Sequence, residues 1–163
     1  MQRLAEAHLL KDDERLTTWR LFLESYRRVL DTLDDELQAE RGLPLTWFDV
    51  LVQLYRAPDR RLRMNQLAGR ILLSKSGLTR LIDRMEAEGL VERASSPNDR
   101  RGSYAVLTPR GERVLREATP VHLEGIEKHF ACHLTAAEAR TLARVFEKIR
   151  EPLISAAECA PTD

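Results

Sequence analysis

The feature that most constrains the fold lies in the middle of the chain, where the spacing of apolar residues changes from a helical to a strand pattern over short segments. Apolar residues spaced three and four apart predict two short helices, Asn65–Ile71 and Lys75–Glu88. Two stretches of alternating character, Leu90–Ser95 and Ser103–Leu107, then predict strands on either side of a turn. Two short helices followed directly by a hairpin indicate a winged helix-turn-helix, in a chain that is otherwise mainly α.

The second of these helices has one apolar face and one polar face. Ser74 is its predicted N-cap and Gly89 its predicted C-terminal glycine. The predicted core face carries Leu78, Leu81, Ile82 and Met85, and the opposite face carries Ser76, Thr79, Arg80, Asp83 and Arg84. Because short hydroxyls and guanidinium groups can approach bases and phosphates closely, we interpret this as a recognition helix. The alternative is an ordinary surface helix with a polar outer face.

The predicted hairpin has two adjacent arginines at its tip. Pro97-Asn98-Asp99 is turn chemistry, and Arg100 and Arg101 follow it. A hairpin beside a recognition helix reaches the neighbouring minor groove, where the negative potential favours arginine. Asp99 is placed to hold a neighbouring guanidinium in position. The alternative is a solvated turn with a local ion pair worth under ~1 kcal/mol.

Longer amphipathic helices are predicted on both sides of this core. One covers about Asp12–Glu40, and Thr46 with Asp49 resembles a capping box for a second, with Trp47, Val50, Leu51 and Leu54 inward. A short extended piece, Arg61–Arg63, precedes the first core helix. After the hairpin, Thr108-Pro109 opens a helix through about His133 that Pro120 is expected to kink, and a capping box at Thr135 and Glu138 opens a last helix to about Ala157.

The formal net charge of zero conceals an asymmetry along the 163 residues. The stretch Arg56–Arg116 has 14 basic and 7 acidic residues, whereas the rest of the chain has 12 basic and 19 acidic residues. A basic middle favours contact with a polyanion, although a solvated charged face has the same composition. No apolar run approaches the ~20 residues that span a bilayer, no signal peptide is recognisable, and two cysteines are too few for a disulfide scaffold, so we expect a cytoplasmic protein without membrane contact.

The central run LAGRILLSKSGLTRLIDRMEAEGLVERASSPNDRRGSYAVLTPRG resembles the DNA-binding core of the MarR (multiple antibiotic resistance regulator) family. The matching pieces are the hydroxyl-rich helix start at Ser74–Arg80, the Glu-Gly-Leu-Val junction at Glu88–Val91, the Asp99-Arg100-Arg101 wing, and Leu107-Thr108 before Gly111. The flanking helices fit this resemblance along essentially the whole chain.

The resemblance implies an obligate homodimer with two recognition helices in successive major grooves of a pseudo-palindromic double-stranded DNA site. It divides the chain into an N-terminal dimerisation region (1–45), a winged helix-turn-helix core (46–108), C-terminal dimerisation helices (109–158) and a tail (159–163). The periodicity supports dimerisation independently. Two long apolar stripes have no obvious partner in so small a domain: Leu123, Ile126, Phe130, Leu134, Leu142, Phe146, Ile149 and Leu153.

The function implied is a transcriptional regulator, with repression as the expected mode and release by a small, aromatic or anionic ligand. Its expected DNA contacts are Ser74, Lys75, Ser76, Thr79, Arg80, Arg84, Asp99, Arg100 and Arg101. The ligand pocket of the family lies between the dimer helices and the winged core. Candidates for it here are the aromatic residues Trp19, Tyr26, Trp47 and Phe48, with Arg20 or His8 to meet an anion.

Other readings of the same residues stay open. The basic winged helix is also compatible with a protein-interaction module for an acidic partner. Oxidant sensing would have to use Cys132 or Cys159, because the first helix has no cysteine. Metal sensing would have to use His129, Cys132 and His133, an incomplete set without nearby carboxylates. We expect no cofactor and no metal, and the absence of a phosphate loop, H-E-x-x-H or G-x-S-x-G argues against an enzyme.

Overall fold

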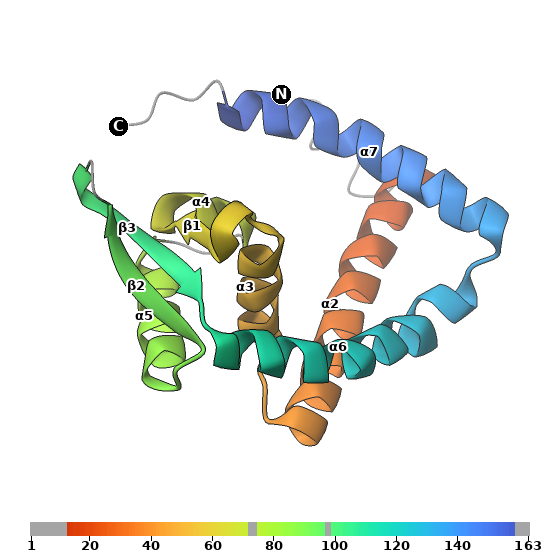
Figure 1. Ribbon diagram of the computed structural model, residues 1–163. Helices are drawn as coiled ribbons and strands as arrows, with labels where there is room; N and C mark the ends of the chain where they lie inside the picture. Colours follow the sequence, from red (N-terminus) through yellow and green to blue (C-terminus); the bar gives the residue numbers. More distant parts are fainter. Residues whose placement is uncertain (1–12, 72–74, 97–98, 159–163) are drawn as a thin grey trace. The chain divides into compact units, whose positions relative to one another are not determined.

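The computed structural model describes residues 13–71, 75–96 and 99–158 (Figure 1). The chain divides into two compact units with a boundary after Leu123. In chain order the elements are α2 (Glu14–Arg41), α3 (Leu45–Arg56), the 3₁₀ turn η1 (Pro58–Arg60), β1 (Arg61–Arg63), α4 (Met64–Arg70), α5 (Lys75–Ala87), β2 (Val91–Ser96), β3 (Asp99–Leu107), α6 (Pro109–His129), the 3₁₀ turn η2 (Ala131–His133) and α7 (Ala136–Glu158).

The three strands form one antiparallel sheet in the order β1-β3-β2. β3 lies in the middle, where Ala105 pairs with Leu62 on one side and with Arg93 on the other. The helix pair α4 and α5 precedes this hairpin directly (Figure 1). The predicted winged helix-turn-helix in a mainly helical chain is therefore confirmed.

The hairpin is longer than its sequence pattern predicts. Pairing continues to Ser96 and Asp99, so Asp99 begins β3 and is not part of the turn. The ladder is irregular between Ser95 and Ser96. The prediction was wrong here because backbone N–H and C=O groups make the ladder whatever the side chain is, and polar residues extend it past the last apolar position. Pro97 and Asn98 lie outside the described residues.

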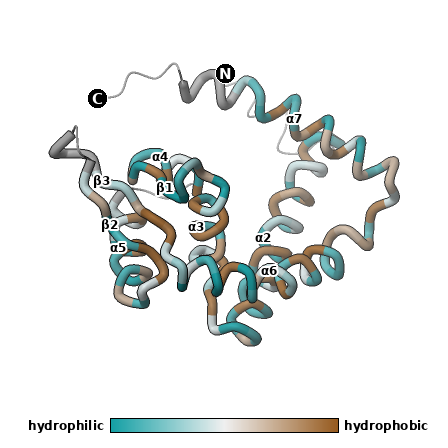
Figure 2. The backbone as a smooth tube through the Cα atoms, viewed as in Figure 1, coloured by the Kyte–Doolittle hydropathy of each residue, from teal (hydrophilic) through white to brown (hydrophobic). Residues whose placement is uncertain are grey.

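The core of the first unit lies where α3, α4, α5 and the sheet meet. Leu51, Leu54 and Ile82 are completely buried, and Phe48 is nearly so. The predicted core face of α5 is confirmed, since Leu78, Leu81 and Met85 are also buried. Trp47, predicted to point inward, is only half-buried, because Phe48 occupies the position against the core. Hydrophobic positions concentrate on α3 and on the inner part of β3 (Figure 2).

The start of α3 differs from the predicted capping box. The helix begins at Leu45 after Pro44, whose side chain makes no cap, so the Thr46 and Asp49 box is wrong. Asp34 of α2 provides the missing acceptor, because its Oδ1 accepts the backbone N–H of Leu45 at 2.6 Å. A helix start needs an acceptor for its free N–H groups, and here a carboxylate from a neighbouring helix supplies it.

Hydrogen bonds and close backbone contact join the end of α5 to the start of α6. Gly89 has a φ of 67°, and the N–H groups of Gly89 and Leu90 donate to Glu86 and Met85, which is the Schellman arrangement predicted for a C-terminal glycine. The Thr108 hydroxyl donates to the carbonyl of Gly89 at 2.7 Å. Gly111 lies so close that a Cβ there would stand 2.1 Å from the carbonyl oxygen of Leu90.

The second unit comprises the end of α6, η2 and α7. The predicted helix through His133 was too long: α6 ends at His129, and Phe130 has non-helical angles before η2. The predicted capping box of the last helix is confirmed, since Glu138 accepts the Thr135 N–H at 2.8 Å and Thr135 accepts the Glu138 N–H at 3.3 Å. The Thr135 hydrogen bonds hold the pKa of Glu138 below its ordinary value.

A bilayer-spanning helix would need a longer apolar stretch than any found in the part of the chain that the structure describes.

Candidate nucleic-acid interface

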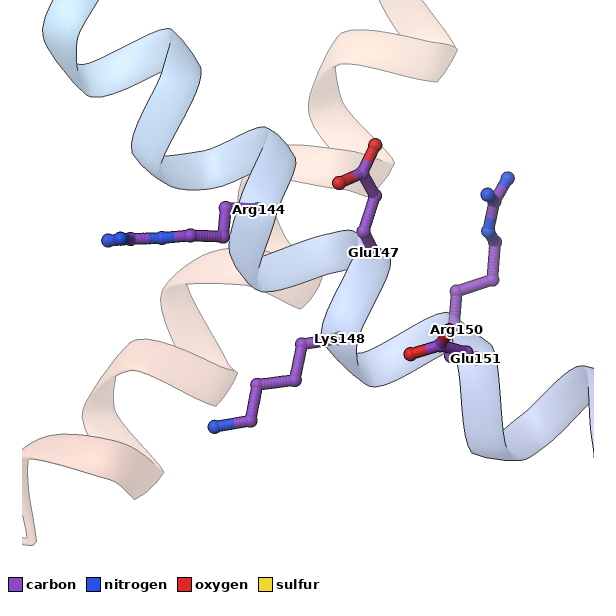
Figure 3. A pocket seen from close by; sticks show the side chains of 5 residues that line it. All are labelled: Arg144, Glu147, Lys148, Arg150 and Glu151. Carbon is purple, nitrogen blue, oxygen red and sulfur yellow. The ribbon is translucent and has the colours of Figure 1, made fainter.

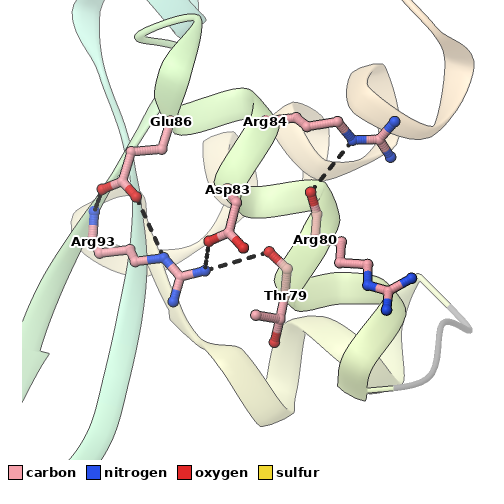
Figure 4. Close-up of polar contacts among 6 residues, drawn as sticks. All are labelled: Thr79, Arg80, Asp83, Arg84, Glu86 and Arg93. Carbon is pink, nitrogen blue, oxygen red and sulfur yellow. Dashed lines mark hydrogen bonds and ion pairs between the residues drawn. The ribbon is translucent and has the colours of Figure 1, made fainter.

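The helix α5 has three faces with different surroundings. The first faces the core through Leu78, Ile82 and Met85. The second, which includes Asp83 and Glu86, faces the hairpin. The third carries Arg80 and Arg84, whose side chains extend away from the hairpin (Figure 4). The sequence pattern separates only the apolar face from the polar one, so it places Asp83 with the two arginines.

Arg93 of β2 joins the hairpin to α5. Its guanidinium contacts Asp83 Oδ1 and lies 3.4 Å from Glu86 Oε2, and it donates to the carbonyl of Thr79 at 3.4 Å (Figure 4). Its backbone N–H donates to Glu86 Oε1 at 3.0 Å. The helical and polar patterns of the sequence do not single out Arg93. The available signal was the strand alternation, because Arg93 follows the buried Val91 by two positions and therefore shares its inward face.

Among the described side chains of α5, the cationic ones are those of Arg80 and Arg84, and both extend away from the hairpin (Figure 4). Both residues are exposed, and Arg84 Nε donates to the Arg80 carbonyl at 3.4 Å. The two carboxylates of α5, Asp83 and Glu86, both pair with Arg93 from outside the helix. Glu88, which follows the end of α5, lies 3.9 Å from Arg110 of α6. The outer face of α5 is thus locally positive although the helix carries two acidic residues, Asp83 and Glu86.

The remaining predicted DNA contacts are described to different degrees. Ser76 and Thr79 are exposed on α5, as expected. Ser74 lies outside the described residues, as do the side chains of Lys75, Asp99, Arg100 and Arg101. The backbone nevertheless places residues 99–101 at the start of β3, at the free end of the hairpin. The predicted role of Asp99 in holding a guanidinium stays a prediction.

Arginines also gather beside the edge strand β1. Arg63 Nε donates to the Tyr104 hydroxyl at 3.1 Å, and the Arg61 guanidinium lies 5.3 Å from the centre of the Tyr104 ring. Arg60 lies 3.7 Å above the ring of Tyr55. These contacts hold guanidinium groups by cation–π attraction while keeping their charge. They account for part of the basic middle of the chain without involving α5.

The predicted ligand-binding residues come from two helices. Trp19 and Tyr26 lie on α2 in a row with Phe22, with ring centres 5.8 and 6.1 Å apart along the row. Both are about half exposed, at 55% and 53%. Arg20 is exposed beside them and Trp47 lies on α3, without a ring contact to this row in the described part of the chain. His8 lies outside the described residues.

Phe48 and His122 form a contact that the sequence does not reveal. The two rings are 4.5 Å apart between centres, and they join α3 to α6 close to the boundary of the first unit. His122 Nδ1 is buried and has no hydrogen-bond partner among the described residues. Burial lowers the pKa of His122 below its ordinary value of 6.5, because the charged imidazolium loses hydration there. Phe48 is therefore a core residue and not an exposed pocket aromatic.

The second unit offers no comparable site in the part that is described. A shallow surface hollow on α7 is lined by Arg144, Glu147, Lys148, Arg150 and Glu151, whose side chains point in different directions (Figure 3). Cys132 is exposed and donates to the Lys128 carbonyl at 3.0 Å. Since α6 ends at His129, His129 and His133 do not share one continuous helix face, and no group of three metal-ligating residues occurs among the described residues.

The arrangement is that of the winged helix-turn-helix class of DNA-binding proteins. It consists of two helices, the second with a positive outer face, and a hairpin fixed beside the second helix. The MarR family model matches residues 41–102. The HTH-type transcriptional regulator YkoM of Bacillus subtilis is 31% identical over 121 residues, which cover 73% of this chain and 75% of that protein. The transcriptional repressor MprA of Escherichia coli is 29% identical over 83% of this chain and 74% of its own.

Solved structures agree with this assignment. Sco3205, a MarR family regulator from Streptomyces coelicolor solved in complex with DNA, superposes with a TM-score of 0.81 at 34% identity, covering 88% of this chain and 93% of that one. The chain belongs to the MarR family and is a DNA-binding transcriptional regulator.

Proposed function

We propose that the protein is a homodimeric repressor that binds a pseudo-palindromic operator and is released from it by a small aromatic or anionic ligand. The observation that carries this proposal is the positive outer face of α5, with Arg80 and Arg84 pointing away from the hairpin and the core. The similarity to the transcriptional repressor MprA of Escherichia coli supports repression as the direction of regulation.

The DNA contacts are assigned to two elements. α5 enters the major groove with Ser74, Lys75, Ser76, Thr79, Arg80 and Arg84 at its start and outer face. The free end of the hairpin, with Asp99, Arg100 and Arg101, reaches the adjacent minor groove. Arg80 and Arg84 are suited to guanine or phosphate because a guanidinium can donate two parallel hydrogen bonds.

Dimerisation is supported by the apolar surface of the helices outside the winged core. Six large apolar side chains are exposed on α2, namely Leu16, Trp19, Leu21, Phe22, Leu23 and Tyr26. The end of the chain exposes another group, Phe130, Val145, Phe146 and Ile149. Monomeric proteins seldom expose so many large apolar residues on single helices, and burial against a second copy would remove them from water.

The effector site is proposed beside the aromatic row of α2. Trp19, Tyr26 and Trp47 would stack on an aromatic ligand, and Arg20 or His8 would meet its anionic group. Titration of aromatic acids against the protein tests this directly by tryptophan fluorescence. A Trp19→Phe variant that still responds while a Trp47→Phe variant does not would move the site towards α3.

The deciding experiment is fluorescence anisotropy on duplexes that tile the DNA upstream of the gene, against scrambled duplexes, at several salt concentrations. We expect one tile to bind tightly, with two chains per site and a steep loss of affinity with salt. Equal weak binding to tiles, scrambled duplexes and genomic fragments alike would contradict sequence-specific recognition. It would favour an acidic protein as the partner of the basic face.

Variants then separate the two proposed groove contacts. Arg80→Ala should weaken operator binding by about 1–3 kcal/mol and relax the preference at one base pair. Arg101→Ala should weaken it by a few kcal/mol at most while leaving folding intact. Arg116→Ala is the matched control, because Arg116 is an exposed arginine that pairs with Glu112 inside α6. Unchanged affinity in a folded Arg101→Ala protein would rule out the wing contact.

A further inference from the structure

We infer that Arg93 is a positioning residue for DNA recognition, which fixes the angle between the hairpin and α5 without touching DNA itself. This inference rests on the proposed function, because it concerns how the two DNA-contacting elements are held together. The supporting observation is that the guanidinium of Arg93 contacts several groups of α5. Arg93 reaches Asp83, Glu86 and the Thr79 carbonyl, which lie along two turns of α5 (Figure 4).

The position of Arg93 in β2 explains why this residue holds the hairpin against α5. On the inward face of β2, Val91 is buried against the core and pairs with Leu107. Arg93 is the next inward-facing position and pairs with Ala105, and both Arg93 and the following inward-facing residue, Ser95, are exposed. Arg93 therefore stands where the apolar core ends and the free part of the hairpin begins, which is the point about which the hairpin would otherwise bend.

The backbone contact adds a second constraint. Glu86 accepts the main-chain N–H of Arg93 through one oxygen and faces its guanidinium through the other. A single carboxylate of α5 thereby holds both the main chain and the side chain of the same strand residue. Charge-assisted hydrogen bonds of this kind are stronger and more directional than neutral ones, so they restrict the hairpin more than apolar contact would.

Arg93 also changes the charge that α5 presents. Asp83 and Glu86 are 58% and 40% exposed at the side chain, and without Arg93 they would be two uncompensated negative charges next to the arginines of the outer face. The side chain of Arg93 is itself 32% exposed, and its guanidinium is directed at α5. The charge of Arg93 is thus paired with carboxylates of the protein, and Arg80 and Arg84 remain the arginines of α5 that can contact the nucleic acid.

The test measures the hairpin in the free protein, where no DNA contact can contribute. Amide hydrogen exchange is recorded for the wild type, Arg93→Ala, Arg93→Lys, Asp83→Ala and Arg110→Ala. In Arg93→Ala we expect exchange in β2 and β3 to become roughly tenfold faster, as for the loss of one or two charge-assisted hydrogen bonds, while α3 and the core of α5 keep their protection. Asp83→Ala should have the same local effect although it removes the opposite charge.

Two variants make the result specific. Arg93→Lys should restore part of the protection, because an ammonium group can pair with one carboxylate but cannot fork between two. Arg110→Ala is the control, since it removes a guanidinium of α6 that lies 3.9 Å from Glu88, just after the end of α5, and should leave the hairpin unchanged. Unchanged exchange of β2 and β3 in Arg93→Ala would overturn the inference, and so would an equal increase in Arg110→Ala.

DNA binding of the same variants gives the second readout. We expect Arg93→Ala to bind the operator about tenfold more weakly, and Asp83→Ala to bind more weakly as well, although removing a negative charge should by itself strengthen binding. Tighter binding by Asp83→Ala would contradict the positioning role. If the wild type recognises no duplex, the proposed function fails, but the exchange experiment still decides whether Arg93 fixes the hairpin.

Discussion

The winged core and the long helices around it use apolar residues in opposite ways. Leu51 and Leu54 of α3 are completely buried, whereas Trp19 and Leu21 of α2 are more than half exposed. The same contrast occurs within α2, where Leu33 and Leu37 are buried near its end. One part of the chain thus completes its own core, and the other exposes large apolar side chains, which under the proposed function a second copy would cover.

The contrast also concerns the polar contacts. In the core, hydrogen bonds join elements that are far apart in sequence, such as Asp34 with Leu45 and Thr108 with Gly89. Along α2, several side chains pair with neighbours in the same helix, as Arg28 does with Glu24. Local contacts stabilise a helix but do not fix its position, whereas contacts between distant elements fix the winged core as a unit.

The largest expected effect tests the self-sufficient core. Leu54→Ala should lower the free energy of unfolding by about 2–5 kcal/mol, because it leaves a cavity where Leu54 is completely buried. Leu21→Ala makes the same chemical change at a residue that is 58% exposed and should cost less than about 0.5 kcal/mol. Urea denaturation of both proteins measures the difference. Similar losses in the two variants would remove the contrast between the regions.

A second prediction concerns the junction that ties α5 to α6. Gly111→Ala should cost about 1–3 kcal/mol or more, because its Cβ would meet the backbone carbonyl of Leu90, which cannot move as a side chain can. Gly69→Ala is the matched control, since a Cβ there meets nothing within 4 Å. Thermal unfolding compares the two. A stable Gly111→Ala protein would show that this junction yields easily and does not fix α5.

A third prediction concerns the exposed apolar residues of α2. The double variant Trp19→Ser and Phe22→Ser should weaken self-association by about tenfold or more, because it removes the largest exposed apolar rings of α2 from the proposed interface. Analytical ultracentrifugation over a range of protein concentrations measures the change, with Arg28→Ala as the control, because Arg28 is an exposed residue of α2 that pairs with Glu24 in the same helix. A wild type that stays monomeric throughout would refute the dimer.

The smallest expected effect concerns pH. Burial lowers the pKa of His122, so the unfolded chain binds a proton at this site more readily than the folded protein does. Stability is therefore complete above the ordinary histidine pKa and falls as the pH drops through about 6.5 towards the lower folded value. His122→Phe keeps a ring against Phe48 and should lose this component. Unfolding at about pH 7.5 and about pH 5.5 compares the two proteins, and parallel pH dependences would contradict the assignment.

Much of the fold follows from local patterns in the sequence. The periodicities of α2, α5 and α7, the glycine at position 89 and the Thr135–Glu138 box each depend on residues within a few positions of one another. The order of two short helices and a hairpin predicts the class of fold in the same way. The outward face of α5 is also readable locally, because a helix with one buried stripe must expose the opposite one.

What only the tertiary structure decided are the contacts between elements distant in sequence. The start of α3 depends on Asp34, 11 residues away, and Asp83 belongs to the hairpin side because Arg93 faces it from β2. Phe48 and His122 are 74 positions apart in the chain yet touch through their rings. The local sequence pattern predicts which face of an element is buried. The partner that satisfies a residue's charge or hydrogen bond depends on which elements pack together, and that is a property of the whole fold.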